Sequence, residues 1–404
     1  MEVLQTRYRV GNTVLVLKSL SQFDVGRTQF EDVAVGLREL GYTVHEIDAE
    51  RPYGTELVTY LNGGDVRFVF DGQGVGTYAT TNGEPIWDKA RIPLISFCGD
   101  SPIYLGDRLS KNIRHWLVCF FCEPLLSLYR RSFPQRAKAQ SGLLPFASRK
   151  RTEGPLKPLR ERKLGLVFAG SYYSESMRVQ SDSPLVTELL AEVIEEAIDD
   201  GTRMVIDVLS DAMTARGVEP QDLEWTQLFT TAQYLERRVR AQRRVRLVSA
   251  IKRLPLHLFG KDEWKGVGLG DNVEFHATRP YPEMGEVYAE TKINIGHLAG
   301  SSGGLHERAV YSMFHGAANI TDRIAVAPTG LEENESIFFF DWKDLDHLEE
   351  RLESLLADDK GLSLVAERGR VAVEEEYSPV AVARRLIALA DRHHYWLALP
   401  PLPP

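Results

Sequence analysis

The sequence has little cysteine, and the cysteines present do not form a recognisable set. Only Cys98, Cys119 and Cys122 occur among 404 residues, an odd number that is too small for a disulfide framework. Cys119 and Cys122 have the spacing of half a zinc site, but no second pair and no histidines at ligand spacing follow. Because the surrounding segment WLVCFFCEP is apolar, we interpret these residues as buried thiols, which fits a reducing cytoplasm.

Long apolar runs and an excess of positive charge are also missing. No run approaches the roughly 20 apolar residues that span a bilayer, and the segment MEVLQTRYRVGN lacks the apolar core of a signal peptide. The formal net charge is −9, which argues against nucleic acid or an anionic membrane as the main partner unless a local basic patch overrides it. We therefore expect a cytoplasmic protein without a membrane span, of unknown oligomeric state.

The composition is that of an ordinary globular chain, but the chain is too long for one core. With 404 residues, of which 43% are hydrophobic and 26% charged, two domains are expected. Apolar segments alternate with segments of helical periodicity, which predicts an α/β class built from βαβ units with parallel sheets. The expected strands are residues 12–19, 42–48, 66–72, 92–100, 116–121, 164–174, 255–260, 272–277, 292–298, 317–322 and 336–341.

The expected domain boundaries follow changes in composition. The segment SRKRTEGPLKPLRERK, residues 148–163, is basic and contains proline, as an interdomain linker does. We predict one Rossmann-like domain in residues 1–155 and a second in residues 156–380, with a helical segment at 184–253. Residues 381–404 are expected to form a C-terminal helix and a proline-rich, extended tail.

The helical segment ends in LERRVRAQRRVRLVSAIKRL, which is rich in arginine. One interpretation is a patch that binds phosphate or nucleic acid. The alternative, which we favour, is a solvated helix face, because apolar residues of the same helix supply a side for packing. These apolar residues are Val239, Val245, Leu247, Val248 and Ile251.

The segment GSSGGLHERAVYSMFHGAANITD, residues 300–322, places glycines directly before a predicted helix. Glycine lets a ligand approach the backbone, and a helix N-terminus offers unpaired N–H groups that suit a phosphate. The alternative is a flexible turn, since glycine-rich turns are common before packing helices. Ligands of parallel sheets lie outside the carboxyl ends of the strands, where we also expect Ser19, Asp71 and Asp100.

Several segments share their order and spacing with a known family. They are IPLISFCGDSPIY, LVFAGSYYSESMR, RLVSAIKRLPLHLFGKDEW, YPEMGEVYAETKINIGH, GGLHERAVYSMFHGAANITD and the closing helices LEERLESLLAD and GRVAVEEEYSPVAVARRLIAL. Together they resemble the CgeB-like glycosyltransferases of spore maturation and their wider GT-B relatives. The resemblance is clearest from residue 164 to residue 390.

The resemblance implies a GT-B fold, in which two Rossmann-like domains face a cleft and a C-terminal helix crosses back to the N-terminal domain. It implies an enzyme that moves a sugar from a nucleotide-diphosphate sugar, preferably a UDP-sugar, to an acceptor hydroxyl. The acceptor would be a glycan, a small molecule or a modified nucleic acid. No metal or other cofactor is expected, because GT-B enzymes usually stabilise the diphosphate with helix N-termini and basic side chains, and no Asp-x-Asp follows a strand in a suitable context.

The resemblance also implies a set of donor-binding residues. Gly303 and Gly304 would let backbone N–H groups reach the pyrophosphate, and Arg308 would pair with phosphate or brace the loop. Tyr311 stands where many relatives have an acid that binds the ribose, so it either hydrogen-bonds the ribose or packs in the helix. Other expected contacts are Gly170, Ser171, Arg178, Lys261, Ser302, Leu305, His297, His306 and, as a stacking partner of the base, Tyr281.

The expected catalytic residues depend on stereochemistry, which the sequence leaves open. An inverting reaction needs a base for the acceptor proton, for which Asp100 is the first candidate and Asp71 the second. The alternative for Asp100 is a turn cap, because Asp before Ser-Pro favours a turn. In a retaining reaction, Glu307 or His306 would contact the donor sugar. A non-catalytic nucleotide-sugar sensor and a phage-type DNA-modifying sugar transferase stay open as other functions.

Overall fold

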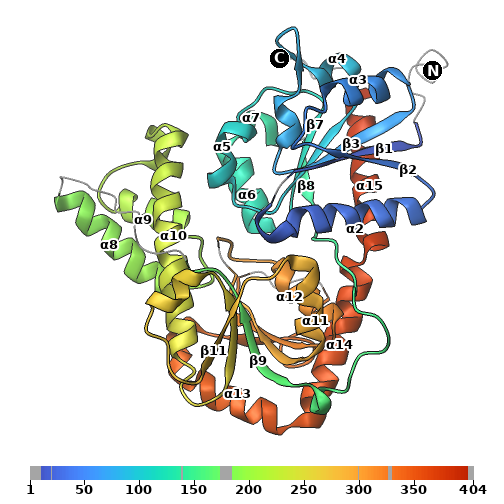
Figure 1. The fold of residues 1–404 in the computed structure, drawn as a ribbon. Coiled ribbons are helices and arrows are strands. Elements are labelled where there is room, and N and C mark those ends of the chain that lie inside the picture. Colours follow the sequence, from blue (N-terminus) through green and yellow to red (C-terminus); the bar gives the residue numbers. More distant parts are fainter. Residues whose placement is uncertain are drawn as a thin grey trace. The chain divides into compact units, whose positions relative to one another are not determined.

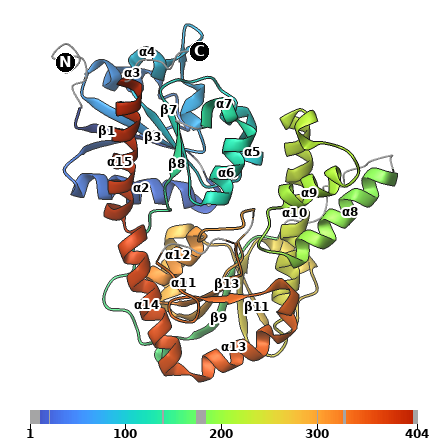
Figure 2. The ribbon, with the colours of Figure 1, turned by 180° about the vertical axis from the view of Figure 1, so that it is seen from behind.

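The chain folds into two compact α/β units. The computed structural model describes residues 11–19, 21–137, 140–172, 184–298, 300–325 and 330–398. Unit 1 comprises Met1–Arg149 and Tyr377–Pro404, and unit 2 comprises Lys150–Glu376. The boundaries predicted after residues 155 and 380 lie a few residues beyond the observed ones, which follow Arg149 and Glu376. Each unit contains one six-stranded sheet with helices on both of its faces (Figure 1 and Figure 2).

The sheet of unit 1 is parallel and has the order β2-β1-β3-β6-β7-β8. Its strands are β1 (Thr13–Lys18), β2 (Thr43–Asp48), β3 (Val66–Gly72), β6 (Leu94–Cys98), β7 (Trp116–Phe120) and β8 (Ser141–Leu143). A small antiparallel pair, β4 (Thr80–Thr81) and β5 (Glu84–Pro85), stands apart. The order reverses between β1 and β3, and ligands of such folds bind at this kind of reversal.

The C-terminal helix of the chain belongs to unit 1. α15 (Pro379–Ala398) lies along α2 (Val25–Glu39), and apolar side chains of both helices share one buried cluster with the sheet. The contact is close, since a Cβ on Gly36 of α2 would lie 2.0 Å from the carbonyl oxygen of Pro379. The prediction that a C-terminal helix returns to the N-terminal domain is therefore confirmed. The other helices of unit 1 are α3 (Gly54–Asn62), α4 (Ile86–Ala90), α5 (Pro102–Leu109), α6 (Glu123–Ser132) and α7 (Pro134–Ala137).

The sheet of unit 2 is also parallel, in the order β11-β10-β9-β12-β13-β14. Its strands are β9 (Leu164–Ala169), β10 (Leu256–Gly260), β11 (Val273–Ala277), β12 (Thr291–Ile295), β13 (Ala318–Asp322) and β14 (Phe338–Phe340). The chain first runs from β9 outward to β11, then returns to β12 and continues to the other edge. The order of unit 2 therefore reverses between β9 and β12.

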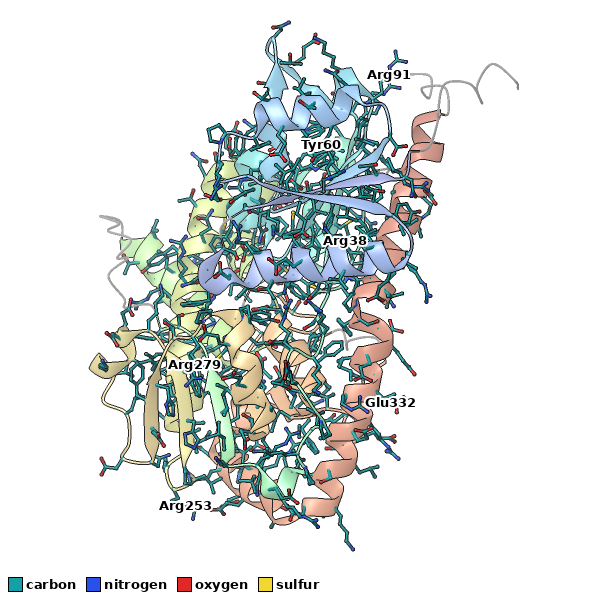
Figure 3. The ribbon with its side chains drawn as sticks, turned by 45° about the vertical axis from the view of Figure 1, so that its right-hand side comes forward. Arg38, Tyr60, Arg91, Arg253, Arg279 and Glu332 are labelled. Carbon is teal, nitrogen blue, oxygen red and sulfur yellow. The ribbon has the colours of Figure 1, made fainter. Side chains whose placement is uncertain are left out.

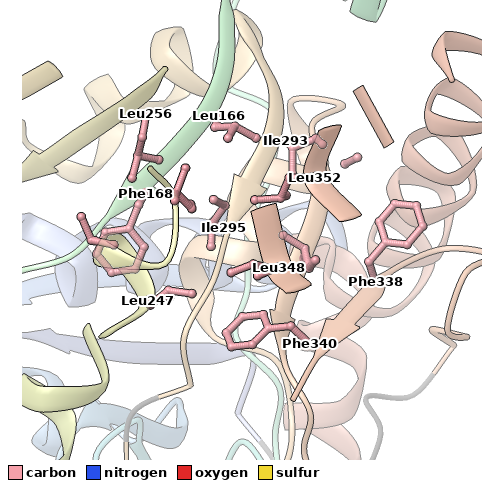
Figure 4. Close-up of a cluster of buried hydrophobic side chains, with 14 of the residues drawn as sticks. Leu166, Phe168, Leu247, Leu256, Ile293, Ile295, Phe338, Phe340, Leu348 and Leu352 are labelled. Carbon is pink, nitrogen blue, oxygen red and sulfur yellow. The ribbon is translucent and has the colours of Figure 1, made fainter. Parts of the chain in front are cut away.

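One face of this sheet carries the main apolar core of unit 2. Figure 4 shows side chains of β9, β10, β12 and β14 packed against Leu247 of α10 (Trp225–Ser249) and against Leu348 and Leu352 of α13 (Leu348–Ala357). α14 (Asp359–Tyr377) adds Leu362 and Val365 to this core. α11 (Met284–Ala289) and α12 (Glu307–Phe314) lie on the opposite side of the sheet from α13 (Figure 1).

The predicted helical segment 184–253 forms a group of three helices, α8 (Pro184–Asp199), α9 (Val205–Thr214) and α10. Two arginines of α10 are buried. Arg243 donates to the carbonyl oxygens of Ala197 and Asp200 at the end of α8, and Arg244 donates to that of Ser171. The prediction of a solvated face is wrong for these two arginines, because their guanidinium groups pair with carbonyls that a helix end and a loop leave free.

Short 3₁₀ helices connect several of these helices and strands. They are η1 (Gln22–Asp24), η2 (Val75–Tyr78), η3 (Leu159–Glu161), η4 (Pro220–Asp222), η5 (Asp262–Gly266), η6 (Tyr281–Glu283) and η7 (Trp342–His347). Of the predicted extended tail, Leu397 and Ala398 instead end α15, and residues 399–404 lie outside the described part of the chain.

All three cysteines are buried and none forms a disulfide, as predicted. Burial raises the pKa of Cys119 to about 12, so its thiol stays protonated and unreactive at neutral pH. Within the described residues, none of the helices combines the length and the apolar character that crossing a membrane requires.

Candidate functional site

Most of the predicted donor residues lie at the carboxyl edge of the unit 2 sheet. Gly170 and Ser171 follow β9, His297 follows β12, and Lys261 follows β10. Because the order of strands reverses between β9 and β12, the loops after these two strands leave in opposite directions. Sheets of this type bind their ligands at such a point, so the topology places the candidate site around the loop between β12 and α12.

Two glycines of this loop have backbone conformations that side chains rarely adopt. Gly300 and Gly304 both have a φ of 82°. A Cβ on Gly300 would also lie 2.6 Å from Oε1 of Glu236, a buried carboxylate on α10. The loop is further tied by the Ser301 hydroxyl, which donates to the Gly303 carbonyl over 2.9 Å. The described residues of this loop are therefore held in one conformation by specific contacts. These contacts disfavour the alternative of a flexible turn.

The first turn of α12 carries a connected row of polar side chains. His306 stands at the N-cap position of the helix, and its Nδ1 lies 2.6 Å from Oε2 of Glu307. Its Nε2 lies 3.0 Å from Nη2 of Arg308. We assign Nδ1–H as donor to Glu307 and Nε2 as acceptor from Arg308, because this tautomer satisfies both ring nitrogens. A second guanidinium nitrogen of Arg308 donates to the carbonyl oxygen of Ala169, at the end of β9.

The charges of this row follow from burial and from these contacts. Burial lowers the pKa of His306, and the adjacent Arg308 charge acts in the same direction, while Glu307 opposes both. Burial by itself raises the pKa of Glu307, but His306 and Arg308 outweigh burial and hold it at about 2. Arg308 therefore joins α12 to β9 across the reversal point. The contact with Ala169 corresponds to the predicted bracing role, and 25% of the Arg308 side-chain surface is exposed.

His297 and Asp322 form a buried pair beside this loop. Asp322 accepts from Nδ1 of His297 over 3.1 Å, and also from the Leu298 amide, the Thr321 hydroxyl and the Trp342 indole. Burial lowers the pKa of His297 to about 4, against the opposing effect of Asp322. The ring is thus neutral, with its proton on Nδ1.

The other nitrogen of His297 is the most informative atom of the site. Nε2 is buried and, among the described residues, has no hydrogen-bond partner. With the proton on Nδ1, Nε2 carries a lone pair and can only accept. Buried polar atoms are rarely left unpaired in proteins, and a bound ligand is one way to satisfy them. A hydroxyl of a ligand is the kind of donor that this atom fits.

Two predicted ligand contacts are packing residues in the structure. Tyr311 is fully buried, and its hydroxyl donates to the Pro282 carbonyl over 2.9 Å. Tyr281 stacks on Tyr311 at a centroid distance of 4.5 Å, and its hydroxyl donates to the Glu307 carbonyl over 3.1 Å. The alternative that Tyr311 packs in the helix is therefore the one the geometry favours. A ribose or base contact of either residue has no support here.

The remaining predicted residues of unit 2 are placed as follows. Gly170 accepts from the Trp264 indole over 2.7 Å, and a Cβ on it would lie 2.9 Å from the Phe168 ring. Ser302 is buried, and its carbonyl accepts from the Ala325 amide over 2.8 Å. Leu305 is buried in the loop, and half-buried Lys261 precedes η5. Arg178 lies outside the described residues.

The two aspartates of unit 1 differ in exposure. Asp100 is exposed beyond the end of β6, and it accepts from the Gln73 amide nitrogen over 2.9 Å. Asp71 is fully buried and accepts from the Gly76 amide. Burial raises the pKa of Asp71 to about 7, a value that suits a base. A base must contact its substrate, however, and burial keeps Asp71 from doing so.

Sequence reasoning missed three residues of the site: Asp322, Arg244 and Trp342. Asp322 ends a strand that was predicted, so the rule on polar residues at strand ends could have found it. Arg244 and Trp342 come from distant segments, and no local signal links them to the loop.

A comparison with known families matches the part of the chain that contains this loop. Residues 238–388, which include the loop and α12, match the model of a family described as glycosyl transferase-like. No curated protein sequence matches the chain closely enough to count as a relative.

Solved structures resemble the chain over nearly its whole length. Anabaena Alr3699/HepE, in complex with UDP and glucose, covers 94% of this chain and 99% of its own, with a TM-score of 0.52 and 10% identity. Sucrose-phosphate synthase from Thermosynechococcus elongatus covers 96% and 100%, with a TM-score of 0.53 and 11% identity. An alpha-glucosyltransferase in complex with UDP-glucose and DNA covers 94% and 99%, with a TM-score of 0.55 and 10% identity.

These likenesses define the fold, because identities near a tenth do not carry substrates from one protein to another. They do not single out the CgeB-like subfamily, which stays a prediction. The chain has the GT-B glycosyltransferase fold, and its residues 238–388 carry the glycosyl transferase-like family pattern.

Proposed function

We propose that the protein is a glycosyltransferase that takes a sugar from a nucleotide-diphosphate sugar, with UDP as the preferred nucleotide, and moves it to an acceptor hydroxyl. The observation that carries the proposal is the loop between β12 and α12. This loop contains two glycines with positive φ and leads into the N-terminus of α12. The buried acceptor Nε2 of His297 lies at the same point, where the order of the strands reverses. The family match over the same residues supports it.

The donor diphosphate would lie against the backbone of Gly303 and Gly304 and the N-terminus of α12. Amides at such an end attract anions. Arg308, whose side chain is 25% exposed, would contribute positive charge while still donating to the Ala169 carbonyl. Nε2 of His297 would accept from a sugar or ribose hydroxyl. These groups stabilise the departing diphosphate without a metal ion, and we propose that the reaction needs none.

We propose Asp100 as the base for an inverting reaction. It is exposed at the carboxyl edge of the unit 1 sheet, whereas Asp71 is enclosed. Its contact with Gln73 would hold the carboxylate in place. In a retaining reaction Glu307, ionised at neutral pH, would instead face the donor sugar. The acceptor itself is not identified by any of these residues.

The test is hydrolysis and transfer with a panel of nucleotide sugars, measured with and without EDTA. Gly304→Ala should lower donor turnover strongly, because alanine is strained at a φ of 82°. Gly217→Ala is the matched control, since Gly217 has a φ of 75° with open space around its Cβ position. Equal activity of the two variants would contradict the role of the loop, and absence of turnover with every donor would contradict catalysis.

The same experiment separates the other two functions. A non-catalytic sensor would bind a nucleotide sugar without hydrolysis or transfer. A DNA-modifying transferase would bind DNA with a steep dependence on salt. One solved neighbour is a glucosyltransferase in complex with DNA, but Arg243 and Arg244 of the arginine-rich helix are occupied inside unit 2.

A further inference from the structure

Two neighbouring strands at one edge of the unit 2 sheet bring two histidines and a glutamate together. β10 and β11 are parallel, with His257 opposite Glu274 and Phe259 opposite His276. Side chains alternate between the two faces of a sheet, so His257, Glu274 and His276 all project from the same face. Leu256, Leu258 and Phe275 project from the other face, toward the apolar core.

The three side chains present their ligand atoms to one another at short range. Nδ1 of His257 lies 3.1 Å from Nε2 of His276 and 3.3 Å from Oε2 of Glu274. Nε2 of His276 lies 3.4 Å from Oε1 of Glu274. Metal–nitrogen and metal–oxygen bonds of zinc are about 2.0–2.2 Å long, so neighbouring ligand atoms of a tetrahedral site are about 3.3–3.5 Å apart. The two imidazole nitrogens have nearly this spacing, and each lies nearest a different oxygen of Glu274. With one ligand atom taken from each residue, the three atoms lie within 4.8 Å of one another.

The surroundings hold the ligands and leave the site open to solvent. The ring of His276 stacks on Phe259 at a centroid distance of 4.5 Å and an interplanar angle of 13°. Arg279, labelled in Figure 3, lies over the Phe259 ring at 5.9 Å. The side chains of His257 and His276 are 15% and 27% exposed, and that of Glu274 is 64% exposed. A solvated ion can therefore reach all three.

We propose that His257, Glu274 and His276 bind a divalent transition-metal ion of the zinc class. Two imidazole nitrogens and one carboxylate are a donor set that such ions favour. Water would fill the remaining coordination positions. Without an ion, the two imidazoles share a hydrogen bond over 3.1 Å, and the ion would replace it.

A metal ion at this site would stabilise the edge strand β11 against β10. β11 is only partly buried along its length, and among the described strands it pairs with β10 alone. A metal bridging both strands would add a link at an edge that is otherwise held by one hydrogen-bonded ladder. The three ligands lie within these strands, outside the loop between β12 and α12, so the proposal is independent of the donor site and of whether the reaction needs a metal.

The test uses the full-length chain without a histidine tag, stripped with EDTA and then dialysed. CoCl₂ titration should give the visible absorption of a protein-bound cobalt ion, and ZnCl₂ should displace it and raise the melting temperature, because an ion that binds only the folded state stabilises it. Amide exchange in β11 should slow on addition of zinc.

Variants decide whether these three residues hold the ion. Altering groups that merely orient metal ligands costs about 10–100-fold in affinity, so losing two ligands in His257→Gln/His276→Gln should weaken zinc binding by at least about tenfold. Glu274→Gln should weaken it less. His347→Ala is the control, because His347 is an exposed histidine that pairs with Asp344 but has no second imidazole beside it among the described residues.

Two results would overturn the proposal. One is an absence of saturable cobalt or zinc binding by the wild-type chain. The other is binding that Glu274→Gln and the double variant leave unchanged. If the double variant fails to fold, as judged by circular dichroism without metal, the exposed Glu274→Gln variant decides alone. None of these readouts involves a nucleotide, so the outcome is separate from that of the proposed function.

Discussion

Four hydrogen bonds converge on the carboxylate of Asp322, a residue that is 1% exposed. They keep the carboxylate ionised and fix the proton of His297 on Nδ1. Asp322 is thus a positioning residue, since it acts on a ligand only through the orientation and tautomer of His297. Asp71, in the other unit, is also buried but has fewer hydrogen-bond donors around it. Burial therefore outweighs its hydrogen bonds and raises its pKa.

Replacing His297 by asparagine distinguishes the role of Nδ1 from that of Nε2. The Asn amide nitrogen can take the place of Nδ1–H as donor to Asp322, but nothing replaces Nε2. A hydrogen bond contributes about 0.5–1.5 kcal/mol net, so we expect nucleotide-sugar affinity to fall up to about tenfold in His297→Asn, measured by calorimetry. Unchanged affinity in a folded variant would show that Nε2 does not contact the donor.

Asp71 predicts a dependence of stability on pH. Its pKa is raised from an ordinary 3.8 to about 7 in the folded chain, chiefly by burial. The folded state therefore holds the proton more tightly, and stability is lost as pH rises through this window. The free energy of unfolding of the wild type should fall by about 2 kcal/mol between pH 5 and pH 7 relative to Asp71→Asn. Parallel pH profiles of the two proteins in urea denaturation would contradict this assignment.

At the scale of elements, α10 links parts of unit 2 that are far apart in sequence. Arg243 pairs with carbonyls at the end of α8 and lies 5.1 Å from the Trp342 ring, while Glu236 borders Gly300. Two arginines of the arginine-rich stretch, Arg243 and Arg244, therefore make contacts inside the unit.

Arg243→Met should destabilise unit 2 by about 2–3 kcal/mol, because it leaves buried carbonyls without a donor. Arg246→Met is the matched control on the same helix. Arg246 pairs with Asp199 at 39% exposure, and an exposed pair contributes about 1 kcal/mol at most. Chemical denaturation followed by circular dichroism would measure both. Equal losses in the two variants would argue against the capping role of Arg243.

At the scale of the whole molecule, the chain leaves unit 1, forms unit 2 and returns to unit 1 through α15. Leu386 of α15 is fully buried in the unit 1 cluster, whereas Leu364 of α14 is 53% exposed. Leu386→Ala should lower the free energy of unfolding by about 3 kcal/mol, and calorimetry should show a lower melting temperature for unit 1. Leu364→Ala should leave the melting temperatures unchanged. Loss of stability in both variants alike would contradict this assignment.

The sequence predicted the strands of the two large sheets except β8, because strands inside a parallel sheet are continuous apolar runs, whereas the edge strand β8 has only three residues. β3, for example, has the predicted bounds 66–72. The glycine loop and α12 were predicted from glycine and helix-start signals. The burial of Arg243 and Tyr281 was not, since their partners are tens of residues away. The meeting of His257 with His276 depends on strand register, which residue patterns alone leave undetermined.

The central claim is that the loop between β12 and α12 binds the diphosphate of a nucleotide sugar. The most direct measurement is the melting temperature of the full chain against a panel of nucleoside diphosphates and their sugars, with and without EDTA. We predict a selective rise with one nucleotide, UDP by preference, that EDTA does not change and that Gly304→Ala abolishes, since a ligand of the folded state stabilises it by mass action. No rise with any member of the panel would contradict the claim.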